Sequence, residues 1–151
     1  MSYNVSYQDI GVREYGDAWN LQEDIFNNLV NSKLQDYRSN RHGESSSHGV
    51  LIFVEHPHVY TLGKSGSENN LLIDHIQLQA KDATFYRTDR GGDITYHGPG
   101  QIVGYPIFDL EKIKINLRKY IFGLEESVIL TATHFGIKAS RLEGATGVWI
   151  D

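Results

Sequence analysis

Val50-Leu51-Ile52-Phe53-Val54 is a continuous apolar run, which is typical of a central strand buried on both faces of a sheet. On either side of it, apolar residues recur at helical spacing, which predicts helices over about Glu14–Tyr37 and Asn116–Phe135. Asn116 is a typical N-cap, and Gly136 stands where a left-handed helix stop is expected. Helices beside a sheet of several strands make the fold class α/β or α+β.

Further strands are expected on both sides of the central run. Thr84–Thr88 and Ile102–Phe108 are strand-like, and Pro106 within the second segment requires an edge position or a bulge. Asn4–Ile10 and Gly147–Ile150 are weaker candidates. The connections between all these elements are too short to separate domains.

The composition describes a folded globular protein and excludes several functional classes. The 151 residues are 40% hydrophobic and 22% charged, and a chain of this length buries roughly 70% of its unfolded surface. A net charge of −5 disfavours a broad nucleic-acid interface, and no apolar run approaches the ~18 residues of a membrane span. The absence of cysteine excludes disulfides and a cysteine nucleophile within these residues. We expect a single cytoplasmic domain over residues 1–151, with no nucleic-acid or membrane partner.

The residues that favour a binding site are concentrated in Arg90–Gln101. Four glycines, an arginine and a histidine fall within this stretch, so backbone amides can approach a ligand closely. A hairpin loop that needs glycine only for its turns is an equally good interpretation of the composition. Neither a P-loop nor a dinucleotide fingerprint matches the spacing, so phosphate binding has little support.

A second polar cluster, Glu55–Gly63, follows the predicted central strand. Its histidines, His56 and His58, invite a zinc interpretation together with His97, but no carboxylate or fourth histidine has suitable spacing. We therefore predict no metal. Glu125-Glu126 lies within the second predicted helix, where a solvated helix face is the preferred interpretation.

Taken together, these stretches resemble the signatures of the octanoyltransferases of lipoate biosynthesis. The glycine-rich element of that family is similar to Arg90-Gly91-Gly92-Asp93-Ile94-Thr95-Tyr96-His97-Gly98-Pro99-Gly100-Gln101. Its upstream E-H-P-x-V-Y-T-x-G element resembles Glu55-His56-Pro57-His58-Val59-Tyr60-Thr61-Leu62-Gly63. Leu124-Glu125-Glu126 and Thr146-Gly147-Val148-Trp149 are similar as well, in the order of the family, so the resemblance covers essentially the whole chain.

The resemblance implies the mixed α/β fold of biotin and lipoate protein ligases, with a sheet flanked by helices. It also implies transfer of an octanoyl group from octanoyl-acyl carrier protein to a lysine of lipoyl domains, through a thioester on a cysteine of the enzyme. The acceptors would be the lipoyl domains of 2-oxoacid dehydrogenase complexes and the glycine cleavage H protein, and no cofactor or metal takes part. A thiolate suits this chemistry because a thioester is already activated, and a glycine-rich loop can supply amide donors to the oxyanion.

The resemblance also places the acyl site. The residues expected to bind the acyl group are Arg90, Gly91, Gly92, Asp93, Ile94, Thr95, Tyr96 and His97. Those expected to support the pocket are His56, Tyr60, Gly98 and Gln101, and those expected to form apolar walls are Ile94, Tyr96, Val59 and Tyr60. Arg90 would position the loop and the substrate, whereas His56 and His97 would lie at the rim. We also expect Arg90–His97 to face Glu55–Gly63 across the principal apolar pocket.

The sequence departs from the family near its end. In the family, the catalytic cysteine and its partner lysine follow the T-G-V-W element, whereas this chain continues only to Asp151 and contains no cysteine. We therefore expect no catalytic residue within residues 1–151. A truncated and inactive octanoyltransferase is the preferred interpretation, and a degenerate member of the family is the alternative.

Two other functions fit the same residues. A lipoate- or biotin-type protein ligase would adenylate a free acid, so ATP binding would distinguish it. A non-enzymatic module that binds acyl carrier protein or lipoyl domains would need a local basic patch. The candidates for such a patch, for which a solvated face is the simpler interpretation, are Lys112, Lys114, Arg118 and Lys119.

Overall fold

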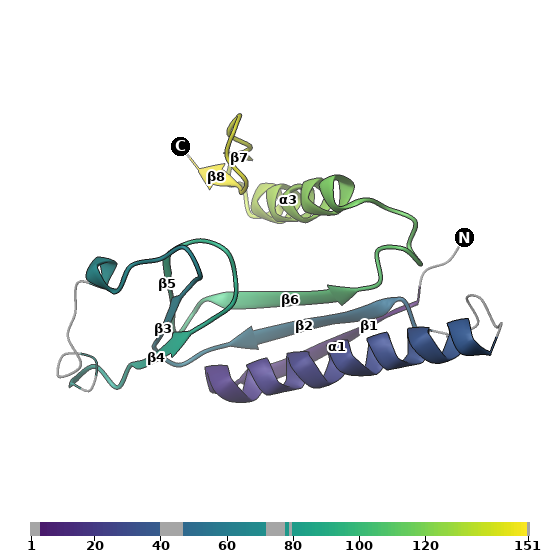
Figure 1. Cartoon of the computed structure of the whole chain (residues 1–151). Helices are drawn as coiled ribbons and strands as arrows, with labels where there is room; N and C mark the ends of the chain where they lie inside the picture. The colour runs from purple at the N-terminus through teal and green to yellow at the C-terminus, as the bar shows by residue number, and fades with distance from the viewer. Residues whose placement is uncertain (1–3, 40–46, 72–77, 79, 151) are drawn as a thin grey trace. The chain divides into compact units, whose positions relative to one another are not determined.

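The computed structural model in Figure 1 describes residues 4–39, 47–71, 78 and 80–150. The chain divides into two compact units, Met1–Phe108 and Asp109–Asp151, and each is described by itself. The prediction of a single domain therefore stays a prediction. Within the described ranges, no helix is both long and apolar enough to span a bilayer.

The first sheet of the first unit is built around the predicted central strand. β2 (Gly49–Glu55) pairs in parallel with β1 (Val5–Val12) and antiparallel with β6 (Ile102–Phe108), which gives the strand order β1-β2-β6. Pro106 lies in β6, at the edge of this sheet and opposite Leu51, as its missing N–H requires. The central position of the Val50–Val54 run is confirmed.

One helix covers the buried face of this sheet. α1 (Tyr15–Arg38) runs along the sheet in Figure 1, and Tyr15 of α1 and Tyr105 of β6 both pack against the His56 ring. Tyr105 is paired with Ile52, which is 1% exposed, so the side chains buried against the helix are those of alternate β2 residues. These residues are Val50, Ile52 and Val54. The opposite face of β2 is only half-buried, so burial on both faces was an overestimate.

A second, smaller sheet carries both polar stretches. β3 (Val59–Leu62) pairs in parallel with β4 (Thr84–Arg87) and antiparallel with β5 (Ile94–His97), and a 3-10 turn, η1 (Glu68–Asn70), follows β3. β4 was predicted, but β3 and β5 were not recognised as strands. Both are four-residue segments rich in β-branched and aromatic residues. From the sequence pattern alone such short segments look like loop, and it is their pairing with each other that stabilises them as strands.

The second unit consists of the second predicted helix and a short hairpin-like pair of strands. α3 (Leu117–His134) begins after Asn116, whose side chain accepts a hydrogen bond from the Lys119 amide at 2.9 Å. Gly136 follows with a φ of +74°, the left-handed stop that the sequence predicted. β7 (Ala139–Ser140) and β8 (Trp149–Ile150) then pair antiparallel.

Candidate functional site

The glycine-rich stretch consists of a short strand between two turns. Residues 90–93 form a turn, Ile94–His97 form β5, and residues 98–101 form a second turn. Because β5 pairs with β3, the stretch lies directly beside Glu55–Gly63 in one sheet.

Strand alternation divides the predicted site residues between two faces of the small sheet. Tyr60 is paired with Tyr96, and their rings lie 5.1 Å apart on what we call the outer face. Thr61 is paired with Thr95 and lies on the inner face, which it shares with His97. Residues adjacent in the sequence therefore serve different surfaces, and the eight residues from Arg90 to His97 do not line one common wall.

The inner face holds a cluster of aromatic and imidazole rings, which we call the inner cluster: Tyr15, His56, Tyr86, His97 and Tyr105. The His56 ring centroid lies 5.4 Å from that of Tyr15 and 6.0 Å from those of His97 and Tyr105. Tyr15 in turn lies 5.1 Å from Tyr86 of β4. The cluster thus gathers side chains from α1, β4, β5, β6 and the turn after β2.

His56 is the buried centre of the inner cluster. Its side chain is 0% exposed, which differs from the rim position expected from the sequence. Nδ1 lies 2.8 Å from the Arg13 carbonyl oxygen, which can only accept, so Nδ1 carries the proton and donates. Nε2 then accepts from the Tyr105 hydroxyl at 3.0 Å. Burial lowers the pKa of His56 below its ordinary value, which keeps the ring neutral.

Two tyrosines of the inner cluster, Tyr15 and Tyr105, are held in their protonated form. Burial raises the pKa of Tyr105 well above its ordinary range. Burial also raises the pKa of Tyr15, against the opposing charge of nearby Arg90. The cluster therefore presents neutral, weakly polar surfaces.

His97 keeps one ring nitrogen available. Its Nδ1 lies 2.6 Å from Oε1 of Gln101, an oxygen that can only accept, so Nδ1 donates. In the neutral ring Nε2 then holds a lone pair, which can accept a proton from a bound group. Gln101, which was predicted to support the pocket, therefore orients His97.

Arg90 supports the turn of residues 90–93 from within. Its Nη2 donates to the Thr61 carbonyl at 2.8 Å and to the Asp93 carbonyl at 2.8 Å, and its Nε donates to the Thr61 hydroxyl at 3.2 Å. Nη1 donates to the Gly91 carbonyl at 3.0 Å. The expected role in positioning the loop has a clear geometric basis.

The turn is braced from outside by the loop after β3. Gly63 N–H donates to the Asp93 carbonyl and Ser65 N–H to the Gly92 carbonyl, at 3.1 and 3.2 Å. A Cβ at Gly63 would collide with the Gly92 carbonyl oxygen, so this close approach requires glycine. Among the described residues, the exposed amides of Gly91 and Gly92 donate to no acceptor.

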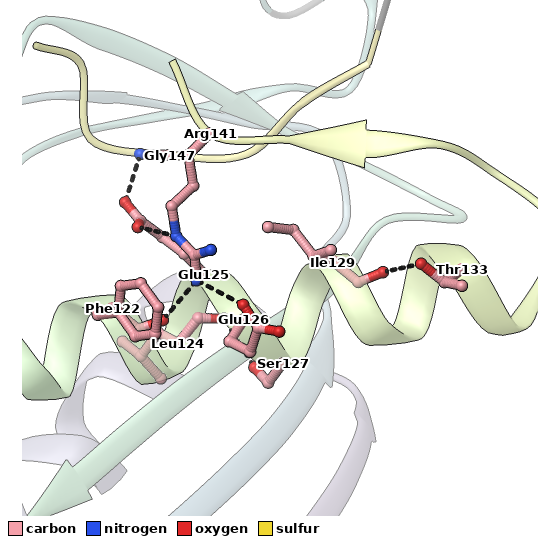
Figure 2. Close-up of polar contacts among 9 residues, drawn as sticks. All are labelled: Phe122, Leu124, Glu125, Glu126, Ser127, Ile129, Thr133, Arg141 and Gly147. Atoms are coloured by element: carbon pink, nitrogen blue, oxygen red, sulfur yellow. Dashed lines mark hydrogen bonds and ion pairs between the residues drawn. The ribbon is translucent and has the colours of Figure 1, made fainter. Parts of the chain in front are cut away.

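The carboxylates of α3 are not simply a solvated helix face, which corrects the interpretation from the sequence. Figure 2 shows Glu125 and Glu126 reaching from α3 to Arg141, with oxygens 2.9 and 2.8 Å from its Nε and Nη2. Glu125 also accepts the Gly147 amide at 2.9 Å. That hydrogen bond, followed by the interaction with Arg141, lowers the pKa of Glu125. The pair thereby ties the T-G-V-W element to the helix.

The basic residues considered for partner docking lie at the start of α3. Lys114, Arg118 and Lys119 are exposed, and Lys112 is half-buried. Among the residues that the structure describes, no group of three or more histidines, aspartates or glutamates is arranged to hold a metal ion. His58, considered with His56 and His97 for zinc, instead bonds the Tyr96 hydroxyl on the outer face.

Sequence reasoning missed Tyr15, Tyr86 and Tyr105 as members of the cluster. Tyr15 was interpreted as part of an apolar helix stripe, and the other two as strand residues. No short motif links positions so far apart in the chain, and only the sheet pairing together with the packing of α1 brings them together.

Comparison with known proteins places this architecture in a family. The sequence profile of the lipoyl protein ligase A/B catalytic domain matches residues 15–151, and the chain belongs to this family. Its curated relatives include the octanoyltransferase of Flavobacterium psychrophilum, 51% identical over 150 residues, and that of Christiangramia forsetii, 50% identical over 151 residues. These alignments cover 99% and 100% of the chain but 64% of each relative, so the chain spans about two thirds of their length.

A solved structure shares the fold at low sequence identity. The bipartite lipoate protein ligase of Thermoplasma acidophilum, studied with its E2 lipoyl domain, superposes with a TM-score of 0.58 at 14% identity. The match covers 94% of this chain and 49% of the ligase chain. The predicted fold of the biotin and lipoate protein ligases is confirmed.

Proposed function

We propose that this chain forms the acyl-binding part of an octanoyltransferase, which moves an octanoyl group from octanoyl-acyl carrier protein to a lysine of a lipoyl domain. The observation that carries the proposal is the inner cluster, where His56, His97 and three tyrosines converge beside the Arg90 turn. The identity of about half of all positions to octanoyltransferases supports the reaction class.

The inner cluster suits a medium-chain acyl thioester. Neutral aromatic rings give the octanoyl chain apolar contact without placing a buried charge beside it. The free amides of Gly91 and Gly92 can donate to the thioester oxygen, which gains negative charge during acyl transfer. His97 can take up the proton that the attacking lysine amine releases, because Nε2 holds a lone pair.

The proposed route passes through a cysteine thioester, and residues 1–151 contain no cysteine. In this proposal the chain binds and orients the acyl group. A thiolate from outside these residues attacks the carbonyl carbon, the C–S bond to the acyl carrier protein breaks, and the carrier thiolate leaves. The acceptors are lipoyl domains of 2-oxoacid dehydrogenase complexes and the glycine cleavage H protein, in the cytoplasm. The Thermoplasma ligase, studied with its own E2 lipoyl domain, supports that class of acceptor.

Two preparations test the proposal: the 151-residue chain, and a graft of this chain onto the part of the Flavobacterium psychrophilum octanoyltransferase that the alignment leaves uncovered. Incubated with octanoyl-acyl carrier protein and a lipoyl domain, the chain alone should form no octanoyl adduct by intact mass, whereas the graft should octanoylate the lipoyl domain. His97→Ala in the graft should lower kcat more than it raises KM.

Three outcomes would overturn the proposal. The first is an octanoyl adduct on the 151-residue chain itself. The second is micromolar ATP binding to the chain by calorimetry, which would indicate a ligase. The third is tight binding of acyl carrier protein by a folded graft that transfers nothing, which would indicate a binding module.

A further inference from the structure

The outer face of the small sheet carries a cavity that the acyl-transfer proposal does not use. It has a volume of about 340 Å³ and is lined by His58, Tyr60, Lys81, Ala83 and Tyr96. This volume falls within the range of small-molecule sites in proteins. Tyr60 and Tyr96 point away from Thr61 and His97 because strand neighbours alternate between faces, so the cavity and the inner cluster lie on opposite sides of β3 and β5.

The cavity walls are two aromatic rings held in place by contacts of their own. Tyr60 and Tyr96 pack with ring centroids 5.1 Å apart, and His58 stacks on Tyr96 at 6.0 Å with an interplanar angle of 24°. Tyr96 is nevertheless 42% exposed. The hydroxyl of Tyr96 also approaches Gly98 so closely that a Cβ there would collide with it. The exposed Tyr96 ring and the half-buried Tyr60 ring, fixed in this way, offer an apolar surface at low entropic cost.

The polar groups of the cavity are hydrogen-bond donors. The Tyr96 hydroxyl and His58 Nδ1 share a hydrogen bond of 2.6 Å. In the neutral pair, one proton lies in that bond and one remains free. If the hydroxyl donates, His58 keeps an N–H at Nε2; if Nδ1 donates, the hydroxyl proton is free. In either arrangement the pair retains one donor for a bound group.

Lys81 adds a positive charge to the cavity, and hydrogen bonds hold the backbone of this residue in place. The Lys81 and Ala83 amides both donate to the Leu78 carbonyl, at 3.1 and 2.9 Å, and Leu78 is only 4% exposed. Lys81 forms no ion pair with any residue in the described part of the chain, and none of the described residues that line the cavity is acidic. The electrostatics therefore favour a negatively charged ligand.

From this arrangement we propose that the outer-face cavity binds a small organic anion: a phosphate or carboxylate group carried on a flat or apolar body. The anionic group is bound by Lys81 and by the free proton of the His58–Tyr96 pair. The body packs against the rings of Tyr60 and Tyr96. The site is separate from the inner cluster, so it holds independently of the acyl-transfer function.

Titration of the 151-residue chain by NMR with phenyl phosphate, octanoate and inorganic phosphate tests this site. Phenyl phosphate should bind saturably and shift the ring signals of His58, with smaller changes at His97. Saturable binding of octanoate at the same signals would support the site and indicate a fatty carboxylate as its natural ligand. Inorganic phosphate should bind at least several-fold more weakly, because it has no body to contact the rings.

Three variants test whether the side chains of Lys81 and Tyr96 bind the anion. Lys81→Ala removes the charge from an exposed position and should weaken phenyl phosphate binding about tenfold, the loss of one charge-assisted contact. Tyr96→Phe keeps the ring but removes the hydroxyl, and should weaken binding several-fold. Lys138→Ala removes the same charge from an exposed lysine of the other unit and should change nothing.

Two results would overturn the proposal. One is the absence of saturable binding for both organic anions. The other is equal weakening by Lys81→Ala and Lys138→Ala, which would indicate a general charge effect without a defined site.

Discussion

Replacing Arg90 by alanine should destabilise the first unit measurably, because the side chain fills its turn with hydrogen bonds. Its three side-chain nitrogens donate to carbonyls of Thr61, Gly91 and Asp93 and to the Thr61 hydroxyl. Thr61 is 0% exposed, so alanine leaves its carbonyl and hydroxyl buried without these donors. An unsatisfied buried polar group costs about 1–3 kcal/mol. Because Arg90 itself is only half-buried and water can enter, we expect a loss of about 2 kcal/mol in the free energy of unfolding.

Urea unfolding and thermal melts of the purified chain measure this effect. A loss of about 2 kcal/mol corresponds to a decrease of roughly 4–8 °C in Tm for a chain of this size. Arg90→Lys provides one rotatable ammonium in place of the planar guanidinium and should recover about half of the loss. Arg118→Ala removes an exposed arginine of α3 and should stay within about 0.5 kcal/mol of the wild type. If Arg90→Ala also fell within that margin, the assignment of Arg90 as the support of the turn would be refuted.

Three further predictions follow from single contacts. Gly63→Ala should lower the free energy of unfolding, because its Cβ would collide with the Gly92 carbonyl oxygen. Gly123→Ala, in open space on α3, should instead raise the free energy of unfolding by about 0.5–1 kcal/mol. Equal effects of the two variants in urea unfolding would contradict the bracing of the turn. Burial lowers the pKa of His56, so the unfolded chain binds a proton more readily than the folded chain. The contribution of His56 to stability should therefore be constant above about pH 6.5 and fall below it, and His56→Asn should show a smaller decrease in urea midpoint between pH 7 and pH 5. In hydrogen-exchange NMR, the Gly147 amide should exchange fastest in Glu125→Ala, more slowly in Glu125→Gln and most slowly in the wild type. Equal exchange rates in the three proteins would exclude Glu125 as the acceptor of this amide.

The elements with strong local signals were predictable from the sequence. Both helices were placed to within a residue or two at each end, because the apolar stripe, the Asn116 cap and the Gly136 stop act locally. The central strand was equally clear as an uninterrupted apolar run. Pro106 was predicted to need an edge position or a bulge because it has no N–H to donate, and it lies in the edge strand β6.

The pairing of β3 with β5 was not predictable in the same way. Val59 and His97 are paired although they lie far apart in the sequence. Each of the two strands has only four residues, and the glycine-rich segments beside them make the local pattern look like loop. Once the pairing is known, alternation assigns Tyr60 and Tyr96 to one face and His97 to the other. Without knowledge of this pairing, the residues of a contiguous motif are expected to lie on one surface.

The roles of individual charged and polar residues depended on the same long-range information. Glu125 looks like a solvated helix residue until Arg141 is placed beside it at 2.9 Å. His56 looks like an exposed strand-end residue until α1 and β6 close over it. In both cases the sequence contains the chemical group, but only the tertiary structure supplies its partner.

In the proposed function the inner cluster, and not the outer face, binds the acyl group. Titration of the chain with S-octanoyl-pantetheine, followed through the histidine ring signals in NMR spectra, tests it directly. We expect saturable shifts at His97 and His56, whose ring centroids lie 6.0 Å apart, and weaker binding in Tyr15→Ala. Shifts confined to His58, with His97 and His56 unchanged at saturation, would contradict it.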